Sequence, residues 1–195
     1  IDDFYLPSEE MNLAIKNNPW NVSRGFPGSH SVKLMHEKLL NWKMNGELNV
    51  PVFDKSLRNG LGDRSHWRSD NPDLLILEGW FLGTEPLSTG INDQCFKSLK
   101  LSSHELAYGL KIQKNLIEYL DVWSLIDNIW HLKPLKFEYM NIWKSNQEKE
   151  MFLKKGNALQ DEKLSNFLRM LNVSIPRKSF DFINSYALLL IDQER

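Results

Sequence analysis

The 195-residue chain is long enough for one domain with a sizeable core, and its composition (42% hydrophobic, 25% charged) is that of a globular protein. Its net charge of −1 gives no electrostatic support for nucleic acid or an anionic membrane as partner, and no apolar run reaches the roughly 18 residues of a membrane span. Cys95 is the only cysteine, which excludes an intrachain disulfide and a cysteine-rich metal site and fits a reducing, cytoplasmic location.

Predicted strands and helices alternate along the chain. Residues 1–7 (IDDFYLP) have the pattern of a strand end that runs into a loop. Apolar periodicity predicts helices over 8–17, 31–46, 103–121, 136–156, 161–172 and 176–185. Ser8 and Ser31 are candidate N-caps, and Gly46 and Gly156 are candidate C-terminal stops. Residues 48–56 are expected to be extended, and 125–134 to form a strand.

Two continuous apolar runs, 73–79 (DLLILEG) and 186–192 (YALLLID), are typical of strands buried on both faces of a parallel sheet. Residues 57–72 are expected to form a polar, glycine-containing loop that is too long for a simple connector. The sequence contains no internal repeat, linker or low-complexity tract. We therefore expect residues 1–195 to form a single α/β domain with a mainly parallel sheet.

Charged residues gather where the predicted strands end. In an open α/β sheet, ligands bind beyond the carboxyl ends of the strands. The carboxylates expected at that edge are Asp2, Asp3, Asp54 and Glu78. The loop residues that can reach the same edge are Arg24, His30, Lys55 and Arg64. A charged crevice above an apolar sheet is the kind of site that phosphoryl transfer requires.

Each of these features also has an ordinary structural explanation. Glu78 can hold Mg²⁺ directly or through water, or it can be a solvated glutamate at a strand end. Asp2 or Asp3 can accept a proton from a substrate hydroxyl, and the alternative is a turn or cap carboxylate. Arg24 and His30 flank a stiff turn that suits a small anion, although an ordinary surface loop has the same composition.

One phosphate-binding motif is absent from the sequence. No segment matches G-x-x-x-x-G-K-[ST], and no Gly-Lys pair occurs. Without that loop, the β- and γ-phosphates of a nucleotide have no cradle. The 195-residue chain by itself is therefore expected to bind ATP weakly or not at all.

Six motifs follow one another in a fixed order. They are IDDFYLP (1–7), RGFPGSH (24–30), VPVFDKS (50–56), GLGDR (60–64), LLILEGWFLG (74–83) and YMNIWKSNQE (139–148). Together they resemble the D-glycerate kinase group of the phosphoribulokinase/uridine kinase type of P-loop kinases. The resemblance spans nearly the whole chain and is weakest over 85–103. It implies a three-layer α/β domain of the P-loop NTPase type, which transfers the γ-phosphoryl group of ATP, with Mg²⁺, to a hydroxyl of a small acid such as D-glycerate.

The same resemblance implies where the absent motif belongs. Members of the group carry their P-loop on the strand and helix just before the segment that corresponds to IDDFY. We therefore expect Ile1 to lie within the domain and this chain to lack the first βα unit, with its P-loop.

The resemblance also assigns roles to individual residues. Asp2 corresponds to the base that acts on the acceptor hydroxyl, and Glu78 to the acid near Mg²⁺. Lys144 and Gln147 lie in the lid helix that contacts the nucleotide, and Lys144 is expected to assist the transfer itself. The expected acceptor-binding residues are Asp3, Tyr5, Arg24, His30, Asp54, Lys55, Asp63 and Arg64.

The chain departs from the family pattern at three positions. The family usually has arginine where this chain has Lys144, and lysine keeps the charge but loses the planar fork. Ser31 replaces an aspartate that usually follows the histidine of the acceptor loop, and a serine can still cap the helix. Leu61 stands where a basic residue is common. These changes bear on the acceptor more than on the fold.

Three functions remain open from the sequence. The first is an ATP-dependent kinase of glycerate, and the second is a kinase of the same group with another acceptor, such as a nucleoside or pantothenate. The third is a non-catalytic relative that binds a nucleotide, a metabolite or a partner. In the kinase hypotheses the partners are small molecules, with neither nucleic acid nor membrane involved.

Overall fold

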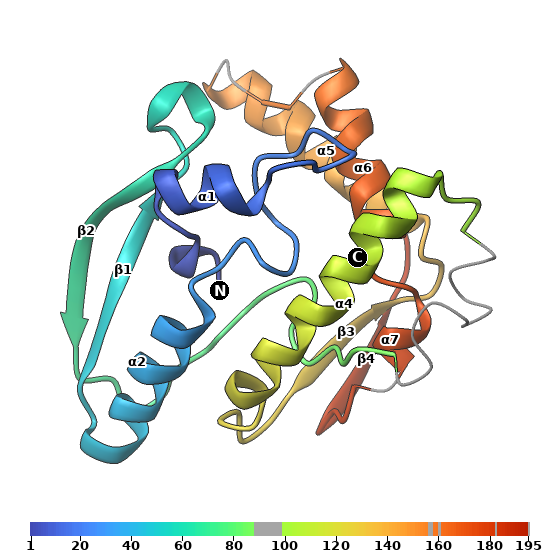
Figure 1. Ribbon diagram of the computed structural model, residues 1–195. Helices are drawn as coiled ribbons and strands as arrows, with labels where there is room; N and C mark the ends of the chain where they lie inside the picture. The colour runs from blue at the N-terminus through green and yellow to red at the C-terminus, as the bar shows by residue number, and fades with distance from the viewer. Residues whose placement is uncertain (88–98, 156–157, 160, 182, 195) are drawn as a thin grey trace.

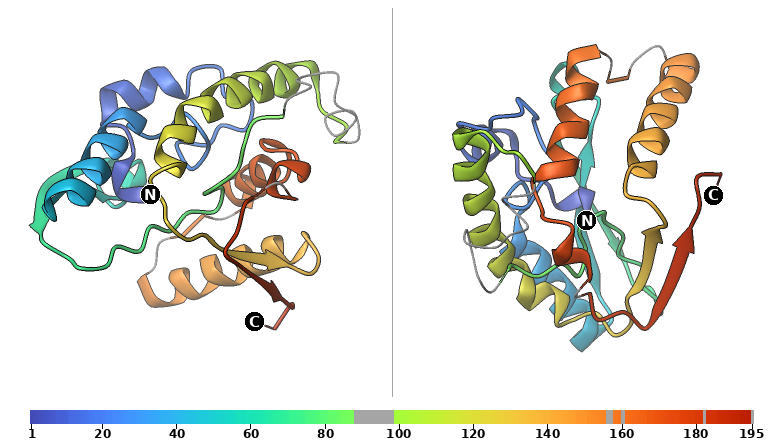
Figure 2. Two further views of the ribbon diagram at one scale, coloured as in Figure 1. Left: turned by 90° about the horizontal axis from the view of Figure 1, so that it is seen from below. Right: turned by 90° about the vertical axis from the view of Figure 1, so that its right-hand side faces the viewer.

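The computed structural model describes residues 1–87, 99–155, 158–159, 161–181 and 183–194. Two residues of the sequence analysis, Cys95 and Gly156, lie outside these ranges. A β-hairpin lies at one side of the molecule and a pair of parallel strands at the other, with the helices α2 (Val32–Asn45) and α4 (Ser103–Trp123) between them (Figure 1). Figure 2 shows the same arrangement from below and from the side.

The N-terminal part begins with the short 3₁₀ helix η1 (Asp2–Phe4) and the helix α1 (Ser8–Ala14). The hairpin consists of β1 (Leu48–Asp54) and β2 (Asp63–Asp70), which pair antiparallel, and η2 (Arg58–Gly60) lies in the turn between them. The loop predicted over 57–72 is therefore wrong over Asp63–Asp70. Most β2 side chains are exposed, so the strand is held by main-chain bonds to β1, and apart from Trp67 its sequence is polar.

The predicted helix over 31–46 is confirmed as α2, which ends at Gly46 in a left-handed conformation with φ 75°. The helix predicted over 103–121 is confirmed as α4. Its N-terminus has a reciprocal cap, because Ser102 Oγ accepts from Glu105 N–H and Glu105 accepts from Ser102 N–H. The side chains of one face of α4 are fully buried: Ile112, Leu116, Tyr119 and Val122.

Glu105 also joins three parts of the fold. It accepts hydrogen bonds from Trp20 Nε1 (3.0 Å) and from Arg169 Nε (2.8 Å) and Nη2 (3.1 Å). The hydrogen bond from Arg169 is the main reason why the pKa of Glu105 falls to about 2. The start of α4, the loop around Trp20 and the later helix α6 (Asp161–Val173) are thus held together by one carboxylate.

The C-terminal part contains α5 (Tyr139–Lys155), α6 and the short α7 (Lys178–Asp181). α5 lies within its predicted segment and α6 extends one residue past its own, whereas α7 covers only 4 residues of the segment predicted over 176–185. The strands β3 (Trp130–Pro134) and β4 (Ala187–Ile191) pair in parallel, from Trp130 beside Ala187 to Pro134 beside Ile191. This pairing and the surrounding helices confirm the α/β class. Within the described residues, no helix combines the length and the apolar character needed to cross a bilayer.

The two apolar runs are less buried than predicted. Leu74 and Ile76 are 76% and 81% exposed, and Leu188 and Leu190 are 55% and 60% exposed. In the described structure, residues 73–79 form no strand, and β4 pairs with β3 alone, so neither run lies in the interior of a sheet. The parallel sheet seen here is therefore small, with two strands.

Candidate functional site

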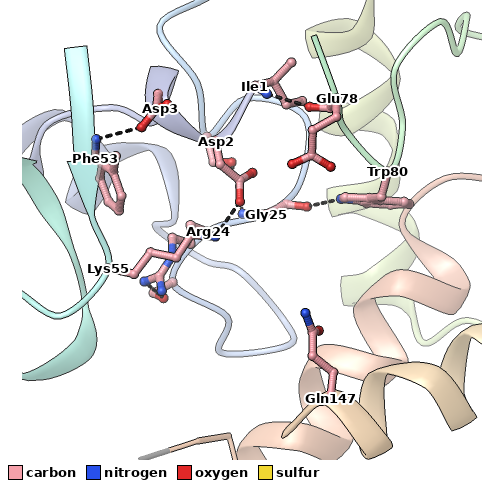
Figure 3. A network of polar contacts seen from close by, with 12 residues as sticks. Ile1, Asp2, Asp3, Arg24, Gly25, Phe53, Lys55, Glu78, Trp80 and Gln147 are labelled. Carbon is pink, nitrogen blue, oxygen red and sulfur yellow. Dashed lines mark hydrogen bonds and ion pairs between the residues drawn. The ribbon is translucent and has the colours of Figure 1, made fainter. Parts of the chain in front are cut away.

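Asp2 and Lys55 form the centre of the candidate site. Asp2 lies in η1, beside the point where the Ile1 backbone nitrogen donates to the Glu78 carbonyl oxygen (2.6 Å). Lys55 directly follows the carboxyl end of β1. Its ammonium donates to Asp2 Oδ2 over 2.6 Å (Figure 3). A short 3₁₀ helix and the end of β1 thus place a carboxylate and a cation side by side. The strand end predicted over residues 1–7 is wrong at Asp2–Phe4, which form η1.

Opposing effects set the pKa of Asp2. Burial raises it, whereas the hydrogen bond and the positive charge of Lys55, with a further hydrogen bond from Tyr5, lower it by more. The pKa is therefore below the ordinary value of 3.8, and Asp2 is a carboxylate at neutral pH. A carboxylate in this state can accept a proton from a hydroxyl group that is placed against it.

A cavity of about 350 Å³ opens beside Asp2. Where β1 ends, its lining is polar and includes Asp2, Asp3, Lys55 and Glu78. Where β1 begins, the lining is mainly apolar and includes Leu39, Leu48, Val50, Leu75 and Leu77, with Arg68 opposite Val50. Figure 3 shows the carboxylates of Asp2 and Glu78 facing a common space. A hydrophilic ligand therefore fits the polar end.

Arg68 is a cavity residue that the sequence analysis did not single out. It lies on β2 opposite Val50 and contributes to the same lining. The segment around it was expected to be a loop, so no face could be assigned to its side chains. The alternation of a strand paired with β1 is the signal that would have located Arg68.

The residues next to Asp2 attach η1 to its surroundings. Asp3 Oδ1 accepts from the backbone N–H of Phe53 (3.1 Å), and Asp3 also lines the cavity. Tyr5 is buried and stacks on His30, with ring centroids 4.5 Å apart. It also meets Phe53 edge-on at 5.0 Å. These contacts fix Asp2 relative to β1.

Asp54 and Asp63, two predicted acceptor residues, bind protein groups near the hairpin turn. Asp54 Oδ1 accepts from the Ser56 backbone N–H (2.8 Å) and hydroxyl (2.6 Å), and these bonds lower the pKa of Asp54. Asp63 Oδ1 accepts from the backbone N–H of Ser8 (3.1 Å). The predicted capping role of Ser8 is wrong, because Pro7 holds the N-cap position of α1 and Asp63 satisfies the free N–H group from across the fold.

Arg64, a further predicted acceptor residue, joins three segments. Its Nε donates to the Tyr5 carbonyl oxygen (3.1 Å), and its Nη2 donates to Ser31 Oγ (2.7 Å). Ser31 occupies the N-cap position of α2, but its hydroxyl makes no capping bond to the helix. Arg64 is thereby directed to η1 and the start of α2, and it is not part of the cavity lining.

Arg24 connects the loop 24–30 to the hairpin turn. Its Nη1 donates to the carbonyl oxygens of Gly60 (3.1 Å) and Leu61 (2.8 Å), and its guanidinium lies 5.8 Å from the centre of the Phe53 ring. Figure 3 shows it beside Lys55. The side chain is therefore held at the site by the main chain of the turn.

The loop 24–30 is fixed from several sides. The Gly25 carbonyl oxygen accepts from Trp80 Nε1 (2.6 Å), which connects the loop to the segment after Glu78. The Gly28 N–H donates to the hydroxyl of Tyr119 (3.0 Å). No pattern in the sequence marked Tyr119, since it lies among the apolar residues of the buried face of α4.

His30 is a buried, neutral histidine. Its Nδ1 lies 2.9 Å from the Tyr119 hydroxyl, which already accepts from Gly28. Which of the two groups donates this hydrogen bond depends on the tautomer of the imidazole. Nε2 has no hydrogen-bond partner in the part of the chain that the structure describes. Burial lowers the pKa of His30 to about 3.

This burial makes folding stability depend on pH. Between the ordinary histidine pKa of 6.5 and about 3, the unfolded chain binds a proton that the folded chain does not. The contribution of His30 is therefore complete above pH 6.5 and decreases as the pH falls, by up to about 1.4 kcal/mol per pH unit. We expect His30→Gln to flatten the rise of unfolding free energy between pH 5 and 7 in urea titrations.

The same substitution at exposed His66 controls for the loss of an imidazole. Equal pH slopes in the wild type and in His30→Gln would show that His30 is not held neutral by the fold.

Lys144 and Gln147 lie on α5, across the space from η1. The Lys144 ammonium lies 2.5 Å from Glu148 Oε1 and donates to Gln147 Oε1 (3.1 Å). Figure 3 shows the Gln147 side chain pointing toward the space that Asp2, Arg24 and Glu78 face. Two groups assigned to nucleotide binding thus come from the opposite side of the site.

The carboxylates fit a magnesium ion that arrives with a nucleotide. The described residues contain no group of three or more histidine, cysteine or acidic side chains that could hold a metal. Protein-bound Mg²⁺ in kinases usually has one or two carboxylate ligands and takes the others from phosphates and water. Glu78 lines the polar end of the cavity and has no ion pair within the described structure, so its carboxylate could serve as such a ligand.

Three curated proteins that are similar to the chain are kinases. The chain is 31% identical to the uncharacterized kinase mug58 of Schizosaccharomyces pombe, over 86% of the chain and 64% of that protein. It is 32% identical to the probable ATP-dependent kinase TDA10 of Saccharomyces cerevisiae, over 96% of the chain and 68% of that protein. It is 29% identical to the chloroplastic D-glycerate 3-kinase of Arabidopsis thaliana, over 86% of the chain and 38% of that protein. The chain belongs to this glycerate-kinase-like family of P-loop kinases.

Solved structures show the same relationship. The D-glycerate 3-kinase of Cryptococcus neoformans has a TM-score of 0.85 and 26% identity over 100% of the chain and 75% of that protein. This match confirms the P-loop kinase fold expected from the six motifs. No family model matches the chain. The chain spans 64% and 68% of the two yeast kinases and 38% of the plant enzyme.

Proposed function

We propose that the chain supplies the acceptor side of an ATP-dependent kinase that phosphorylates a hydroxyl of a small acid such as D-glycerate. The observation that carries this proposal is the Asp2 carboxylate, ionised and held by Lys55 at the polar end of the cavity. An acceptor hydroxyl placed against Asp2 would transfer its proton to the carboxylate as its oxygen attacks phosphorus.

The other residues of the site have roles in positioning and charge neutralisation. ATP supplies the phosphoryl group and Mg²⁺ neutralises part of its charge, with Glu78 as the protein ligand. Lys55 keeps Asp2 oriented, and Arg68 adds a positive charge to the cavity lining. Arg24 adds a second guanidinium, since only its Nη1 is bonded to the turn.

A substrate panel tests the proposal. The complete gene product is incubated with Mg·ATP and D-glycerate, nucleosides or pantothenate, and ADP release is measured. We expect the highest kcat/KM with D-glycerate. Turnover with a nucleoside or pantothenate alone would assign another acceptor to the same kinase. Nucleotide binding by calorimetry, without ADP release for any acceptor, would indicate a non-catalytic relative.

Replacing Lys55 by methionine tests the electrostatic part of the site. Lys55 lowers the pKa of Asp2, so its removal is expected to raise that pKa. The acidic limb of the pH profile of kcat/KM, where the base becomes protonated, should therefore move to higher pH. The control is Lys38→Met, which removes a lysine from α2 that pairs with Glu37. An unchanged acidic limb in Lys55→Met would show that protonation of Asp2 does not cause the acidic limb of kcat/KM.

A further inference from the structure

Glu148 is a nearly inaccessible carboxylate on α5. Its side chain is 3% exposed, and both of its oxygens are engaged. Oε1 lies 2.5 Å from the Lys144 ammonium, and Oε2 accepts from the backbone N–H of Leu159 (2.7 Å). A buried carboxylate with two donors has little freedom to move, and it fixes the groups bonded to it.

Lys144 is held in turn by this carboxylate. Its ammonium lies one helical turn before Glu148 and 5.0 Å from the centre of the Phe167 ring on α6. The charge of Glu148 balances that of Lys144, which weakens any direct attraction of Lys144 for a phosphate group. The same ammonium donates to Gln147 Oε1 over 3.1 Å.

This bond determines how the Gln147 amide is oriented. An ammonium group only donates hydrogen bonds, so the amide oxygen must face Lys144 and the NH₂ group must face away. Figure 3 shows the nitrogen of Gln147 directed toward the space beside Arg24, Gly25 and Trp80. Two N–H donors of a neutral side chain are thus presented to the candidate site.

We infer that Glu148 is a positioning residue for phosphoryl transfer. It orients Lys144, and Lys144 orients the Gln147 amide, which donates to an oxygen of the nucleotide phosphate. The inference rests on the proposed kinase function. It assigns the phosphate contact on α5 to Gln147 and gives Lys144 an indirect role through it.

Steady-state kinetics of the complete gene product test this order of action. Removing the donor in Gln147→Leu is expected to raise the KM for ATP about tenfold, with a smaller change in kcat. Glu148→Gln keeps the side-chain shape and an acceptor for Leu159 but loses the charge that holds Lys144, and it should raise the same KM several-fold. Because Glu148 acts through Gln147, adding Glu148→Gln to Gln147→Leu should cause no further rise.

The control is Glu150→Gln, which removes an exposed carboxylate of the same helix whose ion pair with Lys154 spans 3.6 Å. Its KM for ATP should equal that of the wild type. An unchanged KM in Glu148→Gln, or effects of Glu148→Gln and Gln147→Leu that multiply, would overturn the inference. If Glu148→Gln does not fold, Lys144→Gln breaks the same chain of contacts at a partly exposed residue.

A spectroscopic measurement separates this inference from the proposed function. The side-chain amide of Gln147 gives its own pair of ¹⁵N–¹H signals, whose positions report the bond to Lys144. We expect Glu148→Gln to move these signals and Glu150→Gln to leave them in place, whether or not the wild type shows kinase activity. Absence of ADP release refutes the kinase proposal, whereas unmoved Gln147 signals in Glu148→Gln refute the positioning role.

Discussion

Asp2→Asn is expected to lower the kcat for acceptor phosphorylation by a factor of about 10² to 10⁴ in the complete gene product. Asparagine has almost the same shape as aspartate, but it cannot take the proton of the acceptor hydroxyl, and it leaves Lys55 without its ion partner. The fold should persist, because Asp2 is only partly buried and the η1 contacts made by Asp3 and Tyr5 remain. ADP release at saturating ATP and acceptor measures the effect.

Asp121→Asn is the matched control, since Asp121 is an exposed aspartate on α4 far along the chain from η1. Its kcat should equal that of the wild type. A kcat for Asp2→Asn within a factor of about three of the wild type would show that Asp2 is not the base. A thermal melt of each variant shows whether a lost rate reflects chemistry or unfolding.

Gly28→Ala is expected to lower the free energy of unfolding by about 2 to 4 kcal/mol. Gly28 has a φ of +99°, a region that residues with a side chain rarely adopt. A Cβ atom there would also overlap the Asn115 side chain, whose amide donates to the Pro27 carbonyl oxygen (3.0 Å). Urea unfolding monitored by circular dichroism measures the loss.

Two variants separate the causes of this loss. Gly46 has a φ of +75°, and apart from the glycine and its two chain neighbours no atom lies within 4 Å of the position that a Cβ atom would take there, so Gly46→Ala reports the backbone cost alone. Asn115→Ala removes the overlapping side chain, and Gly28→Ala should be less costly in that background. Equal losses of unfolding free energy for Gly28→Ala and Gly46→Ala would show that overlap with Asn115 on α4 adds nothing to the cost of Gly28→Ala.

The sequence predicted the helices well because their signals are local. The apolar spacing of α2 and its terminal Gly46 can be recognised without knowledge of the rest of the fold. β2 was missed for the opposite reason. Its mainly polar residues, Asp63–Asp70, pair with β1 through the main chain, and their side-chain pattern does not distinguish such a strand from a loop.

The candidate site was predicted in part. The structure brings Asp2, Lys55 and Glu78 to one cavity, although only Lys55 follows a strand end, since Asp2 lies in η1 and residues 73–79 form no strand. The sequence could not distinguish charges that face a ligand from charges that bind the protein itself. Asp63 and Arg64 belong to the second kind, since their partners are main-chain groups and a hydroxyl from distant segments.

The hairpin turn contributes only main-chain oxygens to its hydrogen bonds with the Arg24 guanidinium. Arg24 bonds to the carbonyl oxygens at positions 60 and 61, and the Leu61 side chain is 50% exposed. The leucine of this chain and the basic residue common at this position in the family present the same carbonyl group. The side chain at position 61 can therefore change during evolution without loss of the hydrogen bonds between the loop 24–30 and the hairpin turn, whereas the Arg24 side chain cannot.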